Sequence, residues 1–127
     1  MKSLIKEYLI NASLEDVFNA LTDPDIIEEW SGSPAEMESE PGGSFFLWDG
    51  SIQGFIREIS PTKIVQDWQE ESWDTYSKVT FTLSEEGEKT RLKLVHINIP
   101  SPAYDNVKEG WDEYYMNPMI ELLESED

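Results

Sequence analysis

At 127 residues the chain is long enough to fold as one domain, residues 1–127, around a single core. Its 9 Lys and Arg against 27 Asp and Glu give a formal net charge of −18, which repels nucleic-acid phosphates and anionic membranes. The absence of cysteine and the presence of one histidine exclude disulfides, thiolate chemistry and multi-histidine metal sites. Only a carboxylate site for a hard cation stays open.

We expect no signal peptide in the first residues of the sequence. No apolar run approaches the ~20 residues that span a bilayer, and charges interrupt the first residues where a signal peptide has its apolar centre. We therefore expect a soluble, cytoplasmic protein that contacts neither membranes nor nucleic acids.

The first quarter of the sequence predicts one strand and two short helices. Residues 2–10, KSLIKEYLI, have the β-branched and aromatic content of a strand. Ser13 begins a capping-box pattern, and apolar residues at helical spacing follow as far as Thr22. Asp23 and Pro24 then suit the N-cap and the first position of a second helix. The two helices should meet at a corner.

From Ser31 to Ile99 the apolar residues alternate with a period of two. Turn residues recur at short intervals, including Asp49-Gly50 and Glu86-Gly87 at two expected hairpins. One face of these strands is apolar and the other largely polar, which indicates an antiparallel sheet covered on one side. Gly54 lies inside a strand and indicates a sharp bend or close packing. We expect about six strands in a strongly curved sheet.

The segment GWDEYYMNPMIELLE, residues 110–124, is typical of a long helix with one apolar side. We expect it to lie across the concave face of the sheet, primarily as the element that closes the core. A kink at Pro118 should let Trp111 and Tyr115 press inward. The acidic end, ELLESED, is expected to fray into solvent. The order of these elements along the chain, a strand, two helices, an antiparallel sheet and a long helix, predicts an α+β helix-grip architecture.

No catalytic group of residues is recognisable in the sequence. His96 is the only histidine, and a lone histidine on an apolar face is more often a satisfied core residue than a polar group in a cavity. The side chains of adjacent acidic residues point in different directions, which favours solvent-exposed surface positions over a catalytic pair. The glycines of EPGG and DGSIQG do not open a helix, which argues against nucleotide binding. We expect neither an enzyme nor a cofactor.

Aromatic residues form the remaining candidate site. Five tryptophans is a high number for this length, and a helix-grip fold brings several of them around one space. The simpler interpretation is core packing. The functional interpretation is a small-molecule cavity with sparse polar groups between the sheet and the final helix. The candidate cavity residues are Trp30, Phe45, Gln66, Trp68, Trp73, Phe81, His96, Trp111 and Tyr115.

Five fragments in order carry a resemblance to a known family. They are NASLEDVFNALTDPDIIEEW, PGGSFFLWDGSIQGFIREISPTKIVQDW, YSKVTFTL, TRLKLVHINIP and GWDEYYMNP. Together they resemble the C-terminal domain family of the activator of heat shock protein 90 ATPase, within the START-like, birch-pollen-allergen-like (SRPBCC) superfamily. The resemblance implies a curved sheet wrapped around a long C-terminal helix, often with an apolar cavity.

The resemblance also implies a role. Because the chain starts directly at the C-terminal-type domain, it is expected to be a stand-alone member without the N-terminal domain that grips the chaperone in the eukaryotic activator. Two functions stay open: a non-enzymatic, stress-associated module that binds a chaperone or client protein, and a binder of an apolar or aromatic small molecule. The sequence departs from the family at Gln69, where arginine is common, at Asp74, where proline often occurs, and at Asn98, where many relatives have glycine.

Overall fold

The computed structural model describes residues 1–125. Its elements are β1 (Lys2–Ile10), α1 (Leu14–Thr22), α2 (Pro24–Ser31), β2 (Glu36–Met37), β3 (Ser44–Leu47), β4 (Ile52–Ser60), β5 (Lys63–Glu70), β6 (Ser77–Glu86), β7 (Lys89–Ile99), α3 (Tyr104–Gly110) and α4 (Asn117–Glu124). A short 3-10 helix, Ser101–Ala103, precedes α3. A π-helical segment, Trp111–Met116, joins α3 to α4 and is called the π segment below.

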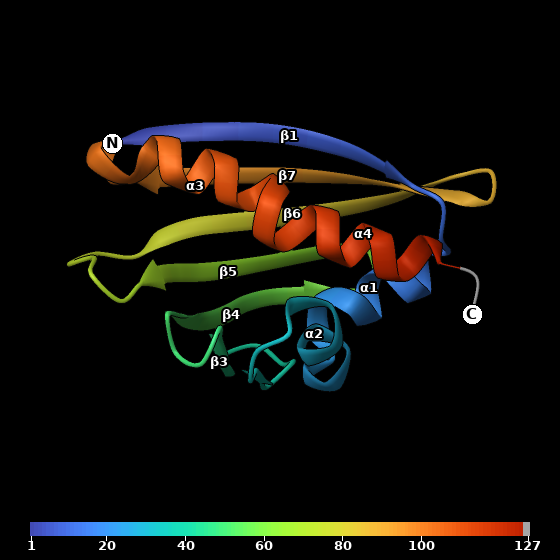
Figure 1. Ribbon diagram of the computed structural model, residues 1–127, viewed down its shortest axis with the longest axis horizontal. Coiled ribbons are helices and arrows are strands. Elements are labelled where there is room, and N and C mark those ends of the chain that lie inside the picture. The colour runs from blue at the N-terminus through green and yellow to red at the C-terminus, as the bar shows by residue number, and fades with distance from the viewer. Residues whose placement is uncertain (126–127) are drawn as a thin grey trace.

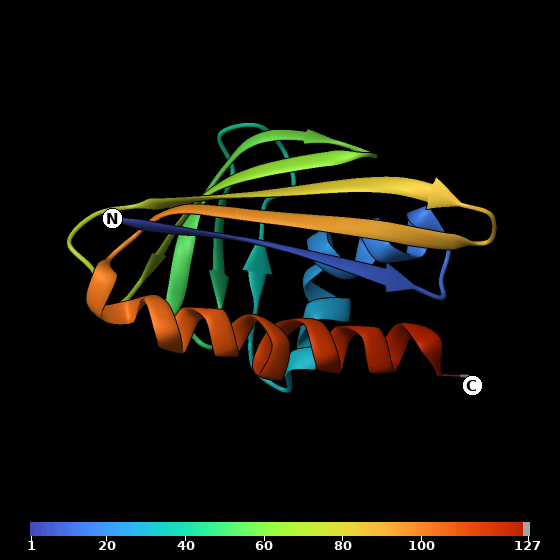
Figure 2. The ribbon, with the colours of Figure 1, turned by 90° about the horizontal axis from the view of Figure 1, so that it is seen from above.

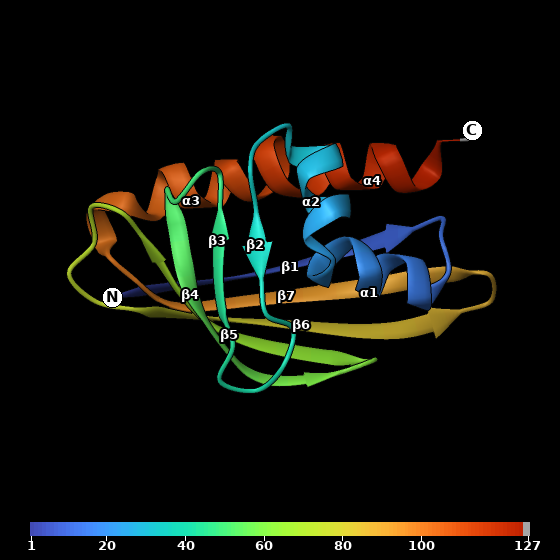
Figure 3. The same ribbon diagram turned by 90° about the horizontal axis from the view of Figure 1, so that it is seen from below.

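The strands form one antiparallel sheet in the order β1-β7-β6-β5-β4-β3-β2. Figure 1 shows α3, the π segment and α4 crossing in front of this sheet. Figure 2, a view turned by 90°, shows the curved sheet along one side of these helices. Figure 3 shows α1 and α2 beside the short strands β2 and β3. The predicted helix-grip fold is confirmed, with seven strands where about six were expected.

The two short helices begin where the sequence predicts. The Asp16 N–H donates to Ser13 Oγ over 3.1 Å, which caps α1. The Asp25 N–H donates to Asp23 Oδ1 over 2.9 Å, and Pro24 follows at the start of α2, where no intrahelical donor is needed. Local capping chemistry therefore fixes the corner between α1 and α2.

The C-terminal helix winds without a break past Pro118. Its irregularity is the π segment, whose last turn has the Asn117 N–H bonded to the Asp112 carbonyl five residues earlier. Pro118 then occupies the start of α4, a position that tolerates proline. The expected kink at Pro118 is thus replaced by a change of winding one turn earlier. Residues 121–124 of the acidic end are helical, and residues 126–127 lie outside the described part of the chain.

The close packing predicted at Gly54 is confirmed. Gly54 of β4 pairs with Trp68 of β5, and a Cβ atom at Gly54 would lie 1.8 Å from the Asp67 carbonyl oxygen and 2.9 Å from Phe45 Cε2. The backbone of β5 and the buried Phe45 ring both occupy the space that any side chain would need. A register shift in the same pair of strands, between Ile56 and Glu58, marks a bulge that increases local twist.

The departure at Asn98 has a backbone explanation. Asn98 has φ of 62°, in the left-handed region that glycine adopts freely and asparagine tolerates. It lies on β7 beside the register shift between Lys2 and Leu4 of β1, and its side chain is exposed. The glycine expected at this position and the asparagine present here therefore meet the same backbone requirement.

Substitution of Asn98 should separate backbone strain from packing. We expect Asn98→Gly to keep the free energy of unfolding within about 0.5 kcal/mol of the parent, and Asn98→Val to lower it by about 1–2 kcal/mol, because a β-branched residue is strained at positive φ. Urea unfolding followed by tryptophan fluorescence measures both. A valine variant as stable as the parent would contradict the backbone explanation.

Within residues 1–125, no helix has the length and apolar character needed to cross a bilayer.

Candidate functional site

Aromatic rings from several elements meet between the sheet and the C-terminal helix. The rings of Trp68 from β5 and Trp111 from the π segment stack with centroids 5.4 Å apart. Tyr115 lies 4.7 Å from Trp111 and 4.7 Å from Trp30 of α2, and Phe81 of β6 stacks on Tyr115 at 6.0 Å. Such pairs contribute about 0.5–1.5 kcal/mol each beyond the burial of area. These rings form the aromatic cluster referred to below.

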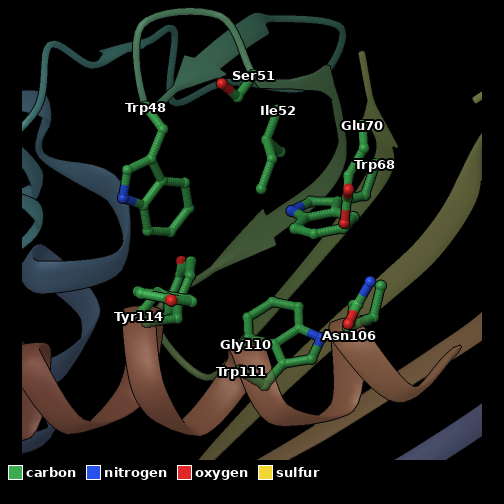
Figure 4. A pocket seen from close by; sticks show the side chains of 11 residues that line it. Trp48, Ser51, Ile52, Trp68, Glu70, Asn106, Gly110, Trp111 and Tyr114 are labelled. Atoms are coloured by element: carbon green, nitrogen blue, oxygen red, sulfur yellow. The ribbon is translucent and has the colours of Figure 1, made fainter. Parts of the chain in front are cut away.

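A pocket of about 400 Å³ lies beside the aromatic cluster, between β5, the β3–β4 turn and the C-terminal helix (Figure 4). Aromatic rings form most of its wall, and a few polar groups interrupt them. The aromatic lining residues are Trp48, Trp68, Trp111, Tyr114 and Tyr115, and the polar ones include Ser51, Glu70 and Asn106. The volume falls within the range of about 300–1,000 Å³ that is usual for small-molecule pockets.

The structure divides the nine predicted cavity residues into two groups. Trp68, Trp111 and Tyr115 line the pocket. The other six residues do not line the pocket. Four of them pack on its lining rings, namely Trp30, Phe81, His96 and Trp73, the last with its centroid 5.9 Å from that of Trp68. Phe45 and Gln66 are buried in the core. Most of the predicted set thus supports the pocket wall instead of forming it.

Sequence reasoning missed Trp48, Glu70 and Tyr114. Trp48 begins the β3–β4 turn with φ of 50°, followed by Asp49 at 56° and Gly50 at 93°. This left-handed run turns the Trp48 ring toward Trp30 and Tyr115, with centroids 6.1 and 5.9 Å away. A tryptophan at positive φ is uncommon and is held there by its surroundings. The only signal in the sequence was an aromatic residue directly before the Asp-Gly turn.

His96 belongs to a hydrogen-bond chain behind the pocket wall. Trp111 Nε1, which can only donate, bonds to His96 Nδ1 over 3.0 Å, so Nδ1 carries no proton. His96 Nε2 then carries the proton and donates to Ser77 Oγ over 2.7 Å, and the Ser77 hydroxyl donates to the Trp68 carbonyl over 2.7 Å. One neutral tautomer satisfies the whole chain of bonds.

The surroundings of His96 keep it neutral. Its side chain is fully buried, and this burial lowers its pKa from 6.5 to about 3. Both ring nitrogens are engaged, and His96 does not line the pocket. It is therefore a satisfied core residue, the more common of the two interpretations, and not a polar group offered to a ligand.

A second set of bonds holds the other side of the π segment. Lys6 Nζ and the Tyr8 hydroxyl of β1 donate to the two carboxylate oxygens of Asp112 over 2.5 and 2.6 Å. These bonds hold the pKa of Asp112 below its usual value although burial opposes this, and burial together with Asp112 raises the pKa of Tyr8. Consecutive residues, Trp111 and Asp112, thus tie the helix to β7 and β1.

Two polar atoms near the cluster are buried without a hydrogen-bond partner among the described residues, Trp68 Nε1 and Gln66 Nε2. Such atoms carry a cost of about 1–3 kcal/mol each. Glu70 lines the pocket, and its partial burial raises its pKa. Within residues 1–125, no group of three or more His, Cys, Asp and Glu side chains is placed to hold a metal ion.

Sequence comparison places this geometry among known proteins. The chain matches the family described as Activator of Hsp90 ATPase homolog 1-like protein over residues 11–124. It is 28% identical over 117 residues to the human Activator of 90 kDa heat shock protein ATPase homolog 1, covering 90% of this chain and 34% of that protein. It is 34% identical over 100 residues to the Dictyostelium discoideum homologue, covering 76% and 26% respectively. The chain spans about a third of these relatives, or less.

Two solved structures resemble the chain over nearly their whole length. An HSP90 activator from Plasmodium falciparum has a TM-score of 0.90 at 34% identity and covers 96% of this chain and 95% of its own. A protein from Mesorhizobium loti has a TM-score of 0.85 at 26% identity, with 99% of each chain covered. Because the family match runs from the end of β1 to the end of α4 and includes the whole aromatic cluster, the chain belongs to the Activator of Hsp90 ATPase homolog 1-like family.

Proposed function

We propose that this protein binds a heat shock protein 90 chaperone in the cytoplasm and raises its ATPase rate without catalysing a reaction itself. The strongest support is the similarity to the HSP90 activator from Plasmodium falciparum, which extends over 96% of the chain at 34% identity. A non-catalytic role agrees with a site whose single histidine is neutral and fully bonded in the core.

The charge of the chain gives this association a testable property. A net charge of −18 favours a basic partner surface and speeds the encounter with it. Salt screens such attraction, because the Debye length falls from ~10 Å at about 0.1 M to ~3 Å at about 1 M ionic strength. We therefore expect affinity for the chaperone to decrease steadily as salt is added.

The direct test is a titration of the chaperone from the same organism with the purified chain. We expect a saturable rise in ATP turnover that disappears when a competitor blocks the chaperone's nucleotide site. Calorimetry at several salt concentrations measures the accompanying binding. A flat turnover curve together with no detectable binding at saturating protein would refute the proposal.

The pocket supports a second candidate function, the binding of a small apolar or aromatic molecule between the sheet and the C-terminal helix. Its volume of about 400 Å³ and its wall of aromatic rings with sparse polar groups support this candidate. A ligand that binds only the folded chain stabilises it by about 2.7 kcal/mol at a concentration of 100 times its Kd, so thermal shift and native mass spectrometry can detect it.

Gly110 offers a matched control for such a screen. It lines the pocket in a helical conformation with φ of −62°, and a Cβ atom there would first meet Tyr114 Cδ2 at 3.8 Å, an ordinary contact. Gly110→Leu should therefore fill the pocket while the fold is kept, and Gly110→Ala should leave most of it open. We expect ligand-induced stabilisation to persist in the alanine variant and to vanish in the leucine variant. Equal stabilisation in both variants would place the ligand elsewhere.

A further inference from the structure

The indole N–H of Trp68 is a hydrogen-bond donor that no other group among residues 1–125 uses. The Trp68 side chain is only 4% exposed, and Nε1 has no acceptor within reach among residues 1–125. Figure 4 shows this nitrogen on the side of the ring that faces the pocket. Buried N–H groups are almost always paired, so an unpaired one on a pocket wall indicates an acceptor that comes from outside the chain.

The indole groups of the other two buried tryptophans of the cluster show that the fold normally provides acceptors. Trp30 Nε1 donates to the Ala20 carbonyl over 2.9 Å, and Trp111 Nε1 donates to His96 Nδ1 over 3.0 Å. Both bonds are buried. Trp68 is the exception among these three, and its nitrogen lies on the side of the ring toward the pocket (Figure 4).

Glu70 places a carboxylate on the pocket wall. It follows Trp68 by two residues on β5, so both side chains lie on the same face of the strand, and both line the pocket. No Lys or Arg forms an ion pair with Glu70 in the part of the chain that the structure describes, and burial raises its pKa. A second anion beside this carboxylate, in a chain with net charge −18, would be repelled.

The shape of the wall selects a flat molecule. Trp68 and Trp111 stack with only 25° between their ring planes and together present a broad aromatic surface to the pocket. Tyr114 and Trp48 complete the wall on the opposite side of the space (Figure 4). Planar ring systems bury the most area against such surfaces.

We propose that the pocket binds a flat, largely apolar molecule that presents a hydrogen-bond acceptor, such as a ring ketone, to Trp68 Nε1 and carries no negative charge. This proposal rests on the second candidate function, because it names the class of ligand for the same pocket. The role of Trp68 is to orient the ligand through one hydrogen bond, and the role of Glu70 is to exclude anions.

The acceptor is tested with two probes of the same three-ring skeleton, 9-fluorenone, which has a ketone, and fluorene, which has none. We expect fluorenone to bind the parent chain about threefold to tenfold more tightly, the difference that one neutral hydrogen bond makes. In Trp68→Phe the ratio should fall to about one. Indole N–H signals in ¹H–¹⁵N NMR spectra identify the group that responds: only the signal that Trp68→Phe removes should move downfield with fluorenone, and it should not do so with fluorene.

The charge preference is tested with 9-oxofluorene-2-carboxylate. We expect this anion to bind the parent chain at least tenfold more weakly than fluorenone. In Glu70→Gln, where both affinities are measured again, we expect the ratio between the two probes to fall to about threefold or less. Glu70 is partly exposed at the end of β5, so the substitution leaves the core intact, which thermal unfolding verifies. An anion that binds the parent chain as well as fluorenone does would overturn the charge preference.

The outcomes separate the two levels of the proposal. Equal affinity for fluorenone and fluorene, abolished in Gly110→Leu, would overturn the role of Trp68 and leave the pocket as a ligand site. Binding of neither probe to the parent chain, with unchanged indole signals, would overturn the ligand-binding function together with this inference. Stimulation of chaperone ATPase is measured without either probe and stands independently.

Discussion

A Gly54→Ala variant is expected to lose more than about 4 kcal/mol of stability or to fail to fold, an effect far beyond that of ordinary substitutions. The added Cβ atom would lie 1.8 Å from the carbonyl oxygen and 2.8 Å from the carbonyl carbon of Asp67. These are backbone atoms of a paired strand, so the clash can be relieved only by separating β4 from β5. Urea unfolding followed by tryptophan fluorescence measures the loss.

Gly110→Ala is the matched control because it makes the same chemical change where the added Cβ atom meets only an ordinary van der Waals contact. The nearest atom to its Cβ is 3.8 Å away, and the residue is helical, where alanine is favoured over glycine by up to about 1 kcal/mol. We expect this variant to be as stable as the parent or slightly more so. Similar stabilities for the two alanine variants would show that the contact at Gly54 is not what restricts that position.

Acidification is expected to destabilise the protein strongly through its single histidine. Burial lowers the pKa of His96 from 6.5 to about 3, so between these values the unfolded chain binds a proton that the folded chain does not. The stabilisation is fully present above pH 6.5 and is lost as the pH falls toward 3. With about 1.4 kcal/mol per pKa unit, the loss amounts to the order of 4–5 kcal/mol.

The presence of one histidine makes this measurement unambiguous. The ring Cε1–H signal in NMR spectra should not titrate between about pH 7.5 and 5, and the ring nitrogens should report a proton on Nε2. Hydrogen bonds also lower the pKa of several carboxylates, such as Glu86 beside Arg91. The stability that these carboxylates contribute to the protein is lost in acid as well. His96→Gln removes only the histidine contribution, so its unfolding free energy should depend less on pH between 6.5 and 4. A Cε1–H midpoint near pH 6.5 in the folded protein would disprove the account.

The parts of the fold that sequence reasoning predicted depend on local chemistry. The capping side chains of Ser13 and Asp23 bond to backbone N–H groups within three positions, so the local sequence is enough to place the start of both helices. The alternation of apolar residues in β6 and β7 likewise gives the buried face directly. Gly54 was recognised as a close approach because glycine has few other reasons to occur inside a strand.

The pocket was only partly predictable because its volume is a property of packing between distant segments. Periodicity identified Trp111 and Tyr115 as inward-facing, yet it cannot tell whether large rings fill a space or surround one. Trp48 reaches the pocket through left-handed backbone conformations that its residue type disfavours. The π segment depends on bonds from Asp112 to β1, more than 100 residues earlier in the chain, and no local pattern encodes them.

The anchoring of the π segment determines how a molecule reaches the pocket. To swing the helix outward would break the Trp111 bond to His96 and both Asp112 bonds to β1, one of them charge-assisted. The turn that carries Trp48 has no side-chain hydrogen bond of this kind among the described residues; it is held by backbone bonds of 2.9 to 3.2 Å and by packing of the Trp48 ring. For the ligand proposed above, we therefore expect entry past the β3–β4 turn, with an exchange rate set by this surface loop while the helical side of the pocket stays in place.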